Sequence, residues 1–467
     1  MAYVEAAARQ IAETATTDKI IVEKSTVPCG TADSIKEIFS AVANPDVNFE
    51  VLSNPEFLAE GTAIKDLLSP DRILIGSENT ETALQAAAAL TDVYAGWVPR
   101  ERVVRINTWS SELAKLAANC MLAQRISSIN SLSAVCEATG ADIDELAYAV
   151  GLDSRIGPKM MKASAGFGGS CFKKDVLSLV YIAESLHLPE VSSYWKSVVD
   201  INEYQKERFT KRITKCLYNT LANKKIAVLG FAYKKNTGDT RESSAISVIG
   251  QMIAENARIA IYDPKVSEEQ IHRDLTMDHK PEIVKKCVTV YKDAYSACEN
   301  ASAVVILTEW DEFKTDTLNI PPAVLNQHQL KAAEASADAH QKSMQRVNTF
   351  NSSSGDSNSA STGSGGESEG EADDNVFSDR SNMSTPMSLD KQELEKSMEA
   401  TMAANKAGGA ASAQPYRLDW TKVASIMRRP RLVFDGRNVV DAPKLEALHF
   451  HVQGIGKTGT RSRMRRS

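Results

Sequence analysis

One cysteine in the sequence lies where a side chain could act as a nucleophile. Cys171 follows three glycines in the run Gly166-Phe-Gly-Gly-Ser-Cys171-Phe-Lys-Lys-Asp175, and a helix is predicted over residues 172–186. Glycines let the backbone approach a ligand, while the start of a helix and two adjacent lysines favour the thiolate form of a thiol. Asp175 lies one turn further along the same face. The sequence therefore predicts either a nucleophilic Cys171 or a glycine-rich anion-binding loop with an inert cysteine.

Lys115 and Asn119 form a second candidate pair, because they lie four residues apart on a predicted helix. At this spacing both side chains project from one face, where they could donate hydrogen bonds to negative charge that develops on a substrate oxygen. The same pattern also fits the solvated side of an amphipathic helix. Local spacing does not separate the two interpretations.

A third candidate segment, Asn54-Pro-Glu56-Phe-Leu-Ala-Glu60-Gly61, directly follows a predicted strand. Loops at the carboxyl ends of strands bind ligands in α/β sheets, so Glu56 is a candidate general base. The alternative is an ordinary strand-to-helix turn with Glu60 in the first helical turn.

Two further segments match nucleotide-binding loops in part. Residues 230–243 lie between a strand and a helix, but they have one glycine where G-x-G-x-x-G requires three. Lys234 and Arg241 suit a phosphate there, and a second α/β unit that binds no nucleotide is the alternative. Residues 454–459 match G-x-G-x-x-G as a string, yet no helix is predicted after them, so we interpret the match as chance.

These candidates require an α/β framework with a helical middle section. Helices and buried-type strands alternate over residues 3–107 and again from residue 224, which predicts two Rossmann-like α/β domains with mainly parallel sheets. Residues 110–218 are predicted to be all-α, with Ser110 or Ser111 as the N-cap of a long helix that stops at Gly140. The predicted strands are residues 19–27, 49–53, 72–76, 224–230, 258–263, 303–307 and 431–435, and the predicted helices are residues 3–14, 32–42, 110–139, 172–186 and 242–256.

The net charge of −6 comes from one low-complexity segment. The 467 residues include 54 basic and 60 acidic ones, and residues 351–382 alone hold seven acidic and one basic residue, ten serines and five glycines. We predict that this segment is disordered, because it has too little apolar surface to offset the entropy of ordering. With its flanks it forms a predicted insertion over residues 315–415. The rest of the chain is neutral overall, which argues against a general nucleic-acid binder.

The remaining composition is typical of a cytoplasmic protein. No run approaches the ~18 apolar residues of a membrane span, and the N-terminus lacks an apolar signal segment. The seven cysteines show no C-x-x-C spacing, so we expect reduced thiols and neither disulfides nor a metal site. The arginine-rich tail over residues 458–467 is expected to be a solvated terminus, with a nuclear-import or anionic-partner signal as the alternative.

In their order along the chain, these segments resemble the UDP-glucose/GDP-mannose dehydrogenase family, and within it the UDP-glucose 6-dehydrogenases of eukaryotic type. The resemblance covers about residues 3–314 and 418–457. It is carried by Glu23-Lys-Ser-Thr26-Val-Pro, Ser53-Asn-Pro-Glu56-Phe-Leu-Ala-Glu60-Gly-Thr, Trp109-Ser-Ser-Glu-Leu-Ala-Lys115-Leu-Ala-Ala-Asn119, residues 166–175, Gly238-Asp-Thr-Arg-Glu-Ser243 and Phe434-Asp-Gly-Arg437.

The resemblance implies three domains: a partial NAD-binding domain over residues 1–107, a helical dimerisation domain over 108–220, and a UDP-binding domain over 221–314 and 416–457. It also implies homodimers that assemble into hexamers. The implied reaction is an NAD-dependent, four-electron oxidation of UDP-glucose to UDP-glucuronate. Cys171 would attack the intermediate aldehyde, and oxidation of the thiohemiacetal would give a thioester that water hydrolyses.

The resemblance further implies a role for each matching residue. Lys115 and Asn119 would stabilise the oxyanion and handle protons, Asp175 and Thr26 would position water, and Glu56 would act as the base in hydrolysis. The residues that would hold the UDP-sugar are Glu56, Phe57, Leu58, Ala59, Glu60, Lys115, Asn119, Arg155 (from a neighbouring subunit), Lys162, Phe167, Gly168, Tyr233, Lys234 and Arg437. The residues that would face NAD are Thr26, Glu60, Cys171, Lys174 and Arg241.

Two departures from the family pattern leave alternatives open. The glycine-rich dinucleotide turn that the family would place about 100 residues before Met1 has no equivalent here, so we expect weak or no NAD binding and an exposed sheet edge. The insertion separates Arg437 from the rest of the UDP-binding domain. A dehydrogenase of GDP-mannose or a UDP-N-acetyl sugar, and an inactive UDP-sugar-binding subunit, are therefore alternative functions.

Overall fold

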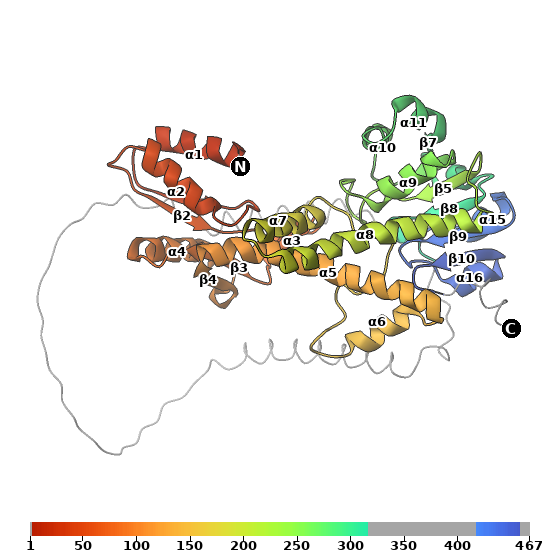
Figure 1. Ribbon diagram of the computed structural model, residues 1–467, viewed down its shortest axis with the longest axis horizontal. Helices are drawn as coiled ribbons and strands as arrows, with labels where there is room; N and C mark the ends of the chain where they lie inside the picture. The colour runs from red at the N-terminus through yellow and green to blue at the C-terminus, as the bar shows by residue number, and fades with distance from the viewer. Residues whose placement is uncertain (1, 316–416, 458–467) are drawn as a thin grey trace, which may run out of the picture. The chain divides into compact units, whose positions relative to one another are not determined.

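The computed structural model describes residues 2–315 and 417–457 (Figure 1). Almost all of the predicted insertion over residues 315–415, including its predicted disorder, and the predicted tail over residues 458–467 lie outside the described residues. Among the described residues, no helix is long and apolar enough to cross a membrane.

The first α/β unit contains a four-stranded sheet in the order β1-β2-β3-β4. Its elements are α1 (Ala2–Thr14), β1 (Lys19–Glu23), α2 (Thr31–Val42), β2 (Phe49–Ser53), α3 (Ala63–Leu68), β3 (Ile73–Ser77), α4 (Glu81–Tyr94), η1 (Arg100–Arg102) and β4 (Val103–Asn107). The strands pair in parallel except β2 and β3, which meet antiparallel through Ser53 and Gly76. The expectation of a mainly parallel sheet is thus correct for two of the three strand pairs.

The predicted strand over residues 19–27 is too long, because β1 ends at Glu23. Glu23 pairs with Ser53, the last residue of β2, so no partner strand continues beyond this point. Residues 24–30 instead form a loop that leads into α2. Side chains of α1 and α2, including Ala8, Ile35 and Phe39, pack with Val51 of β2 in the core of this unit.

The central section is helical, as predicted. It consists of α5 (Thr108–Thr139), α6 (Ile143–Gly151), α7 (Phe172–Ser185) and α8 (Pro189–Cys216), and α5, α7 and α8 pack against one another. The N-cap of α5 is Asn107, not Ser110 or Ser111, because the Asn107 side chain accepts the N–H of Ser110 directly after β4. Ser111 is fully buried and bonds Ser53 of β2 instead.

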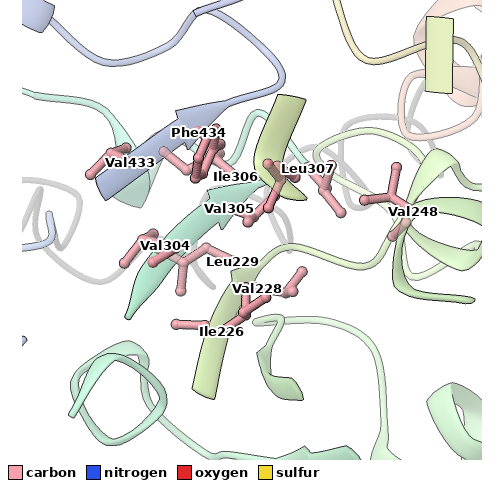
Figure 2. Close-up of a cluster of buried hydrophobic side chains, with 14 of the residues drawn as sticks. Ile226, Val228, Leu229, Val248, Val304, Val305, Ile306, Leu307, Val433 and Phe434 are labelled. Carbon is pink, nitrogen blue, oxygen red and sulfur yellow. The ribbon is translucent and has the colours of Figure 1, made fainter. Parts of the chain in front are cut away.

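The second α/β unit contains an all-parallel sheet in the order β10-β9-β8-β5-β6-β7. Figure 2 shows its apolar core, in which side chains of the central strands, such as Val228, Val305 and Phe434, pack together. Its elements are β5 (Lys225–Leu229), α9 (Ser244–Ala254), β6 (Arg258–Tyr262), α10 (Glu268–Leu275), α11 (Pro281–Cys287), β7 (Val288–Val290), α12 (Ala294–Cys298), β8 (Ala303–Ile306), η2 (Asp311–Phe313), α15 (Trp420–Ile426), β9 (Arg431–Asp435), α16 (Ala442–Ala447) and β10 (Phe450–Gly454). The predicted helix over residues 242–256 starts later, because Ser243 is its N-cap.

The residues that flank positions 316–416 are joined to one another by hydrogen bonds. Trp420 Nε1 donates to the carbonyl of Phe313 at 3.3 Å, and the N–H of Leu418 donates to the carbonyl of Glu312 at 2.8 Å. β9 pairs with β8, so Arg437 returns to the same sheet as β5. The strands before and after the segment thus complete one sheet.

The chance match to a dinucleotide loop at residues 454–459 has a packing explanation within its described part. Gly456 has φ +67°, and a Cβ there would lie 2.5 Å from Cβ of Ile143. Its N–H donates to Glu137 at 2.8 Å, and its carbonyl accepts the N–H of Ile143 at 3.1 Å. This glycine therefore lets the C-terminal strand region contact α5 and α6 closely.

Candidate active site

The glycine-rich segment leads into α7 and leaves the Cys171 side chain exposed at the residue before the helix. Gly169 has φ +91°, and a Cβ there would lie 2.9 Å from the ring of Tyr233. The N–H of Gly169 donates to the carbonyl of Arg241 at 2.9 Å. The segment thus reaches the loop between β5 and α9, and Cys171 lies at the N-cap of α7.

Asn119 of α5 and Asp175 of α7 form a buried hydrogen-bonded pair. Asn119 Nδ2 donates to Asp175 Oδ2 at 2.6 Å, and the two residues are 9% and 1% exposed. Lys174 Nζ lies 3.1 Å from the other oxygen, Asp175 Oδ1. Two residues predicted from separate motifs are therefore in contact, one helical turn after Cys171.

Lys115 is buried, which argues against the solvated helix face considered above. It is 5% exposed, its Nζ lies 3.4 Å from Glu56 Oε1, and the same nitrogen lies 5.1 Å from the ring centre of Phe57. A buried lysine needs a partner, and the loop after β2 supplies it. Glu56 and Lys115, like Asn119 and Asp175, are thus brought together by the fold.

The loop that carries Glu56 is fixed at its start by Asn54. The N–H of Asn54 donates to Glu23 O at 2.8 Å, its Nδ2 donates to Leu74 O at 2.6 Å, and its Oδ1 accepts the hydroxyl of Tyr94 at 2.6 Å. Leu58 and Ala59 lie further along this loop and are exposed, and the N–H of Ala59 donates to Asp66.

Glu60 links this loop to the second α/β unit. Its carboxylate accepts the hydroxyls of Thr237 at 2.6 Å and Tyr233 at 3.2 Å, and its carbonyl accepts Lys234 Nζ at 2.7 Å. All three donors belong to the loop between β5 and α9. Burial and the nearby Glu60 carboxylate raise the pKa of Tyr233, so this hydroxyl is a donor at neutral pH.

Arg437 occupies the carboxyl ends of the central strands in the second sheet. Its Nη2 donates to Tyr233 O at 2.6 Å, its Nε donates to Leu307 O at 2.8 Å, and Nε lies 3.3 Å from Glu309 Oε2. The strand order reverses between β5 and β8, and ligands bind at such a point in open α/β sheets. Tyr233, Lys234 and Arg437 therefore surround the position where this unit is expected to bind a ligand.

The carboxylate of Asp263, at the end of β6, already accepts hydrogen bonds on both oxygens and is not available to a ribose hydroxyl. Its two oxygens accept the N–H groups of Phe231, Ala232, Lys265 and Val266 and the indole of Trp310. In dinucleotide-binding units, an acidic residue near the end of the second strand bonds the ribose. The second unit thus lacks this feature, as its single glycine in place of three also indicates.

The remaining predicted site residues differ in their burial and in their contacts. Phe167 is buried and its N–H donates to Asn202, while Gly168 is buried beside it. Lys162 and Lys174 are exposed, and Thr26 is half-buried in the loop between β1 and α2. Arg241 pairs with Asp239, two residues before it, and Arg155 pairs with Asp153 on an exposed turn after α6.

Sequence reasoning missed two buried glutamates beside the loop that carries Thr26. Burial raises the pKa of Glu23 to about 7. Glu112 of α5 is 2% exposed and accepts backbone N–H groups at the start of α2. Both lie in segments that carry the family resemblance, but no role was predicted for either, since their burial results from packing between elements far apart in sequence.

A cavity of about 600 Å³ lies between this loop and α7. Pro28, Cys29 and Trp109 form one side, and Lys174, Leu177 and Tyr181 are among the residues of α7 that form the other. Its walls are mostly apolar, with the Lys174 cation at one side. Among residues 2–315 and 417–457, no group of three or more His, Cys, Asp or Glu side chains is placed to hold a metal ion.

The chain has two α/β units around a helical section, and a cysteine at the start of a helix lies among buried polar side chains. These features define an α/β protein of the nucleotide-binding class. Three models of the UDP-glucose/GDP-mannose dehydrogenase family match the chain: the NAD binding domain over residues 1–98, the central domain over 109–204 and the UDP binding domain over 227–331. The chain belongs to this family.

Relatives of known activity match about two thirds of the chain. A UDP-glucose 6-dehydrogenase of Drosophila melanogaster is 60% identical over 314 residues, which are 67% of this chain and 66% of the relative. UDP-glucose 6-dehydrogenase 1 of Oryza sativa subsp. japonica is 57% identical over 327 residues, 68% of each chain. A solved UDP-glucose dehydrogenase from Pyrobaculum islandicum is 34% identical, with a TM-score of 0.58 over 66% of this chain and 68% of that chain. The chain spans just under two thirds of the length of the Drosophila relative.

Proposed function

We propose that the protein oxidises UDP-glucose to UDP-glucuronate with NAD as the oxidant. The observation that carries the proposal is the exposed Cys171 at the start of α7, one turn before the buried pair of Asn119 and Asp175. The relatives named UDP-glucose 6-dehydrogenase support the choice of substrate over GDP-mannose or a UDP-N-acetyl sugar.

Cys171 acts as the nucleophile in this proposal. Its thiolate forms a bond to the carbon of the intermediate aldehyde, and the carbonyl electrons move to the oxygen. Lys115 and Asn119 donate hydrogen bonds to that oxygen, and such preorganised donors stabilise developing charge best where water is excluded. The burial of both residues supports this role.

Hydrolysis of the thioester uses the carboxylates. A water held by Thr26 and Asp175 attacks the acyl carbon, Glu56 accepts the proton of that water, and the bond between carbon and sulfur breaks so that Cys171 leaves as a thiolate. The contact of Glu56 with Lys115 supports this assignment, because it places the carboxylate beside a candidate oxyanion donor.

We further propose that Tyr233, Lys234, Arg437, Arg155 and residues 162–168 hold the nucleotide sugar together with residues 57–60. Lysine and arginine are the side chains that bind phosphate most often, and two of them lie at the strand ends of the second sheet. The contacts of Glu60 with Tyr233 and Lys234 support a single substrate site that both loops share.

Thr26, Glu60, Cys171, Lys174 and Arg241 are the proposed NAD contacts. When bound, NAD supplies the acceptor for the hydrides that conversion of an alcohol to a carboxylate releases. The cavity between the β1–α2 loop and α7 is the candidate place for part of the cofactor, because its walls are largely apolar and Lys174 adds a donor. Within the described residues, no G-x-G-x-x-G run joins a strand to a helix, so weak NAD binding stays a prediction, which calorimetric titration with NAD tests.

We also propose a cytoplasmic homo-oligomer, built from dimers and assembling to hexamers. None of the seven cysteines forms a disulfide, which suits a reducing compartment. Large apolar side chains of α5, among them Met121 and Val135, are 60% and 55% exposed, which suits burial against a second copy. Light scattering of the purified protein measures the number of copies.

Turnover with matched substrates tests the proposed function. The purified protein is incubated with NAD and either UDP-glucose or GDP-mannose, and reduced nicotinamide and uronate are measured together. We expect two equivalents of reduced nicotinamide per UDP-glucuronate and little turnover of GDP-mannose. Preference for GDP-mannose would contradict the substrate assignment, and UDP-glucose binding without turnover would favour a binding subunit.

A further inference from the structure

One buried carboxylate beside the candidate site has no part in the reaction described above. Glu112 lies near the start of α5; its Oε2 accepts the N–H of Gly30 at 2.6 Å, and its Oε1 accepts the N–H of Ala32 at 2.9 Å. Gly30 is the N-cap of α2 and has no side chain to cap the helix. Glu112 therefore caps α2 from another element, since the first N–H groups of a helix lack partners within it.

Two further side chains of α5, Trp109 and Ser111, fix the same junction. Trp109 Nε1 donates to Asp33 Oδ2 at 2.9 Å, and a Cβ on Gly30 would lie 3.3 Å from the Trp109 ring. Ser111 and Ser53 hydroxyls lie 3.0 Å apart. The first turns of α5 thus hold the start of α2 and the end of β2 at the same time.

The loop held at this junction carries Thr26. At the start of the loop, Lys24 Nζ donates to Asn54 O at 3.3 Å, beside the segment that contains Glu56. At its end, Pro28 and Cys29 line the same cavity as Lys174 of α7. The loop therefore runs from the Glu56 segment to the first turn of α7.

Glu112 belongs to the same rigid helix as the candidate oxyanion donors. It precedes Lys115 by three residues and Asn119 by seven, which places all three on one side of α5. α5 thus carries the candidate oxyanion donors and also holds the loop in position. Burial raises the pKa of Glu112, whereas the N–H groups it accepts lower it.

We propose that Glu112 is a positioning residue, whose carboxylate holds the β1–α2 loop, and with it Thr26, in register with Lys115, Asn119 and Asp175. The inference rests on the proposed function. Release of the acyl group requires that the water oxygen bonds to the acyl carbon while the carbon–sulfur bond breaks and Glu56 takes the proton. This step uses Thr26, so it depends most strongly on the position of the loop.

Glu112→Gln tests this role, because it keeps the size of the side chain but replaces one accepting oxygen by an NH2 group facing a backbone N–H. We expect kcat for uronate formation to fall about 10- to 100-fold, while KM for UDP-glucose changes less than about twofold. A covalent acyl adduct on Cys171 should accumulate and be visible by intact-protein mass spectrometry. Glu145→Gln, an exposed glutamate of α6, is the matched control and should behave as the wild type.

Hydrogen exchange supplies a measurement that does not depend on turnover. Amides of residues 24–32 should exchange faster in Glu112→Gln than in the wild type, and those of α6 should not change. Loss of kcat with an equal loss of UDP-glucose affinity, or unchanged kinetics despite faster exchange, overturns the proposal. If the wild type makes no UDP-glucuronate, the proposed function fails instead; exchange in residues 24–32 then decides whether Glu112 holds the loop, and unchanged exchange refutes it.

Discussion

Two candidate catalytic side chains, Lys115 and Asp175, differ from ordinary surface residues in their burial. Lys115 is 5% and Asp175 is 1% exposed, and burying such groups costs free energy unless partners compensate. Each has a partner on another element: Glu56 for Lys115, and Asn119 for Asp175. Buried polar side chains that contact one another next to an exposed thiol are typical of active sites. Their burial lowers stability, and it is kept because the reaction needs them.

Replacing the thiol tests the residue on which the proposed reaction depends. In Cys171→Ser, we expect UDP-glucuronate formation to fall by at least about 1000-fold, because a serine hydroxyl is a far weaker nucleophile than a thiolate. UDP-glucose affinity, measured by calorimetric titration, should stay the same. Cys216→Ser, at the end of α8, is the matched control. Uronate formation by Cys171→Ser at the wild-type rate would exclude a covalent role for this residue.

Glu23 should make the stability of the protein depend on pH. Burial raises its pKa from 4.5 to about 7, so between these values the folded protein binds more protons than the unfolded chain. The free energy of unfolding therefore falls as pH rises from 4.5 to about 7, and this loss is complete above that range. We expect a contribution of about 1–2 kcal/mol, reduced by partial solvation from the full value of the shift.

Urea unfolding at pH values across this range measures the effect. Glu23→Gln has no charge to bury, so it should lose this part of the pH dependence and be more stable than the wild type at pH 8. Glu37→Gln, an exposed glutamate of α2, should keep the wild-type profile. Identical profiles for Glu23→Gln and the wild type would show that Glu23 is not the group responsible.

At the scale of elements, the ends of α5 connect the parts of the molecule. Its first turns contact α2 and β2 through Glu112 and Ser111. Near its other end, Glu137 pairs with Arg208 and Arg212 of α8 and accepts the N–H of Gly456. One helix thus contacts both α/β units, and we expect substitutions at either of its ends to affect the site that it carries.

The contact of Gly456 with Ile143 can be tested with a matched pair of glycines. Gly456 and Gly157 have nearly equal φ angles, +67° and +69°, but a Cβ would lie 2.5 Å from Ile143 at Gly456 and would meet nothing within 4 Å at Gly157. Gly157→Ala thus measures backbone strain alone, about 1 kcal/mol, whereas Gly456→Ala adds overpacking of about 1–3 kcal/mol. Chemical denaturation measures both, and equal losses would show that the close approach is not required.

At the scale of the whole molecule, the sequence predicted the order of α/β, helical and α/β sections because strand and helix periodicities are local properties. It also predicted Cys171, Lys115, Asn119, Asp175 and Glu56 as candidates. It did not predict that these residues pair, since the contacts join positions such as 119 and 175, far apart in the chain. It missed β4, β7 and β10, which lie at the edges of the two sheets and depend on a neighbouring strand more than on their own pattern.

The flanks of the undescribed segment lead to a prediction for the complete chain. Residues 312–315 and 417–420 are joined by hydrogen bonds, and Asp441 N–H donates to Thr315 Oγ1 at 2.7 Å. The second sheet therefore needs only a connection between its two parts, and the length of that connection affects stability weakly.

Replacing residues 316–416 by a six-residue glycine–serine linker should leave the fold and the affinity for UDP-glucose unchanged. Each halving of the length of a connection lowers its closure cost by about 0.6 kcal/mol, so we expect unfolding to cost up to about 3 kcal/mol more than in the full chain. Trp420→Ala in the shortened chain tests the contact between the two flanks. Trp420 is 5% exposed, and its indole donates a hydrogen bond to Phe313 O across the junction. This substitution should cost about 3–5 kcal/mol, and it should weaken UDP-glucose binding because Arg437 lies beyond the junction. A shortened chain that fails to bind UDP-glucose, while the full chain binds it, would mean that residues 316–416 contribute to the site directly.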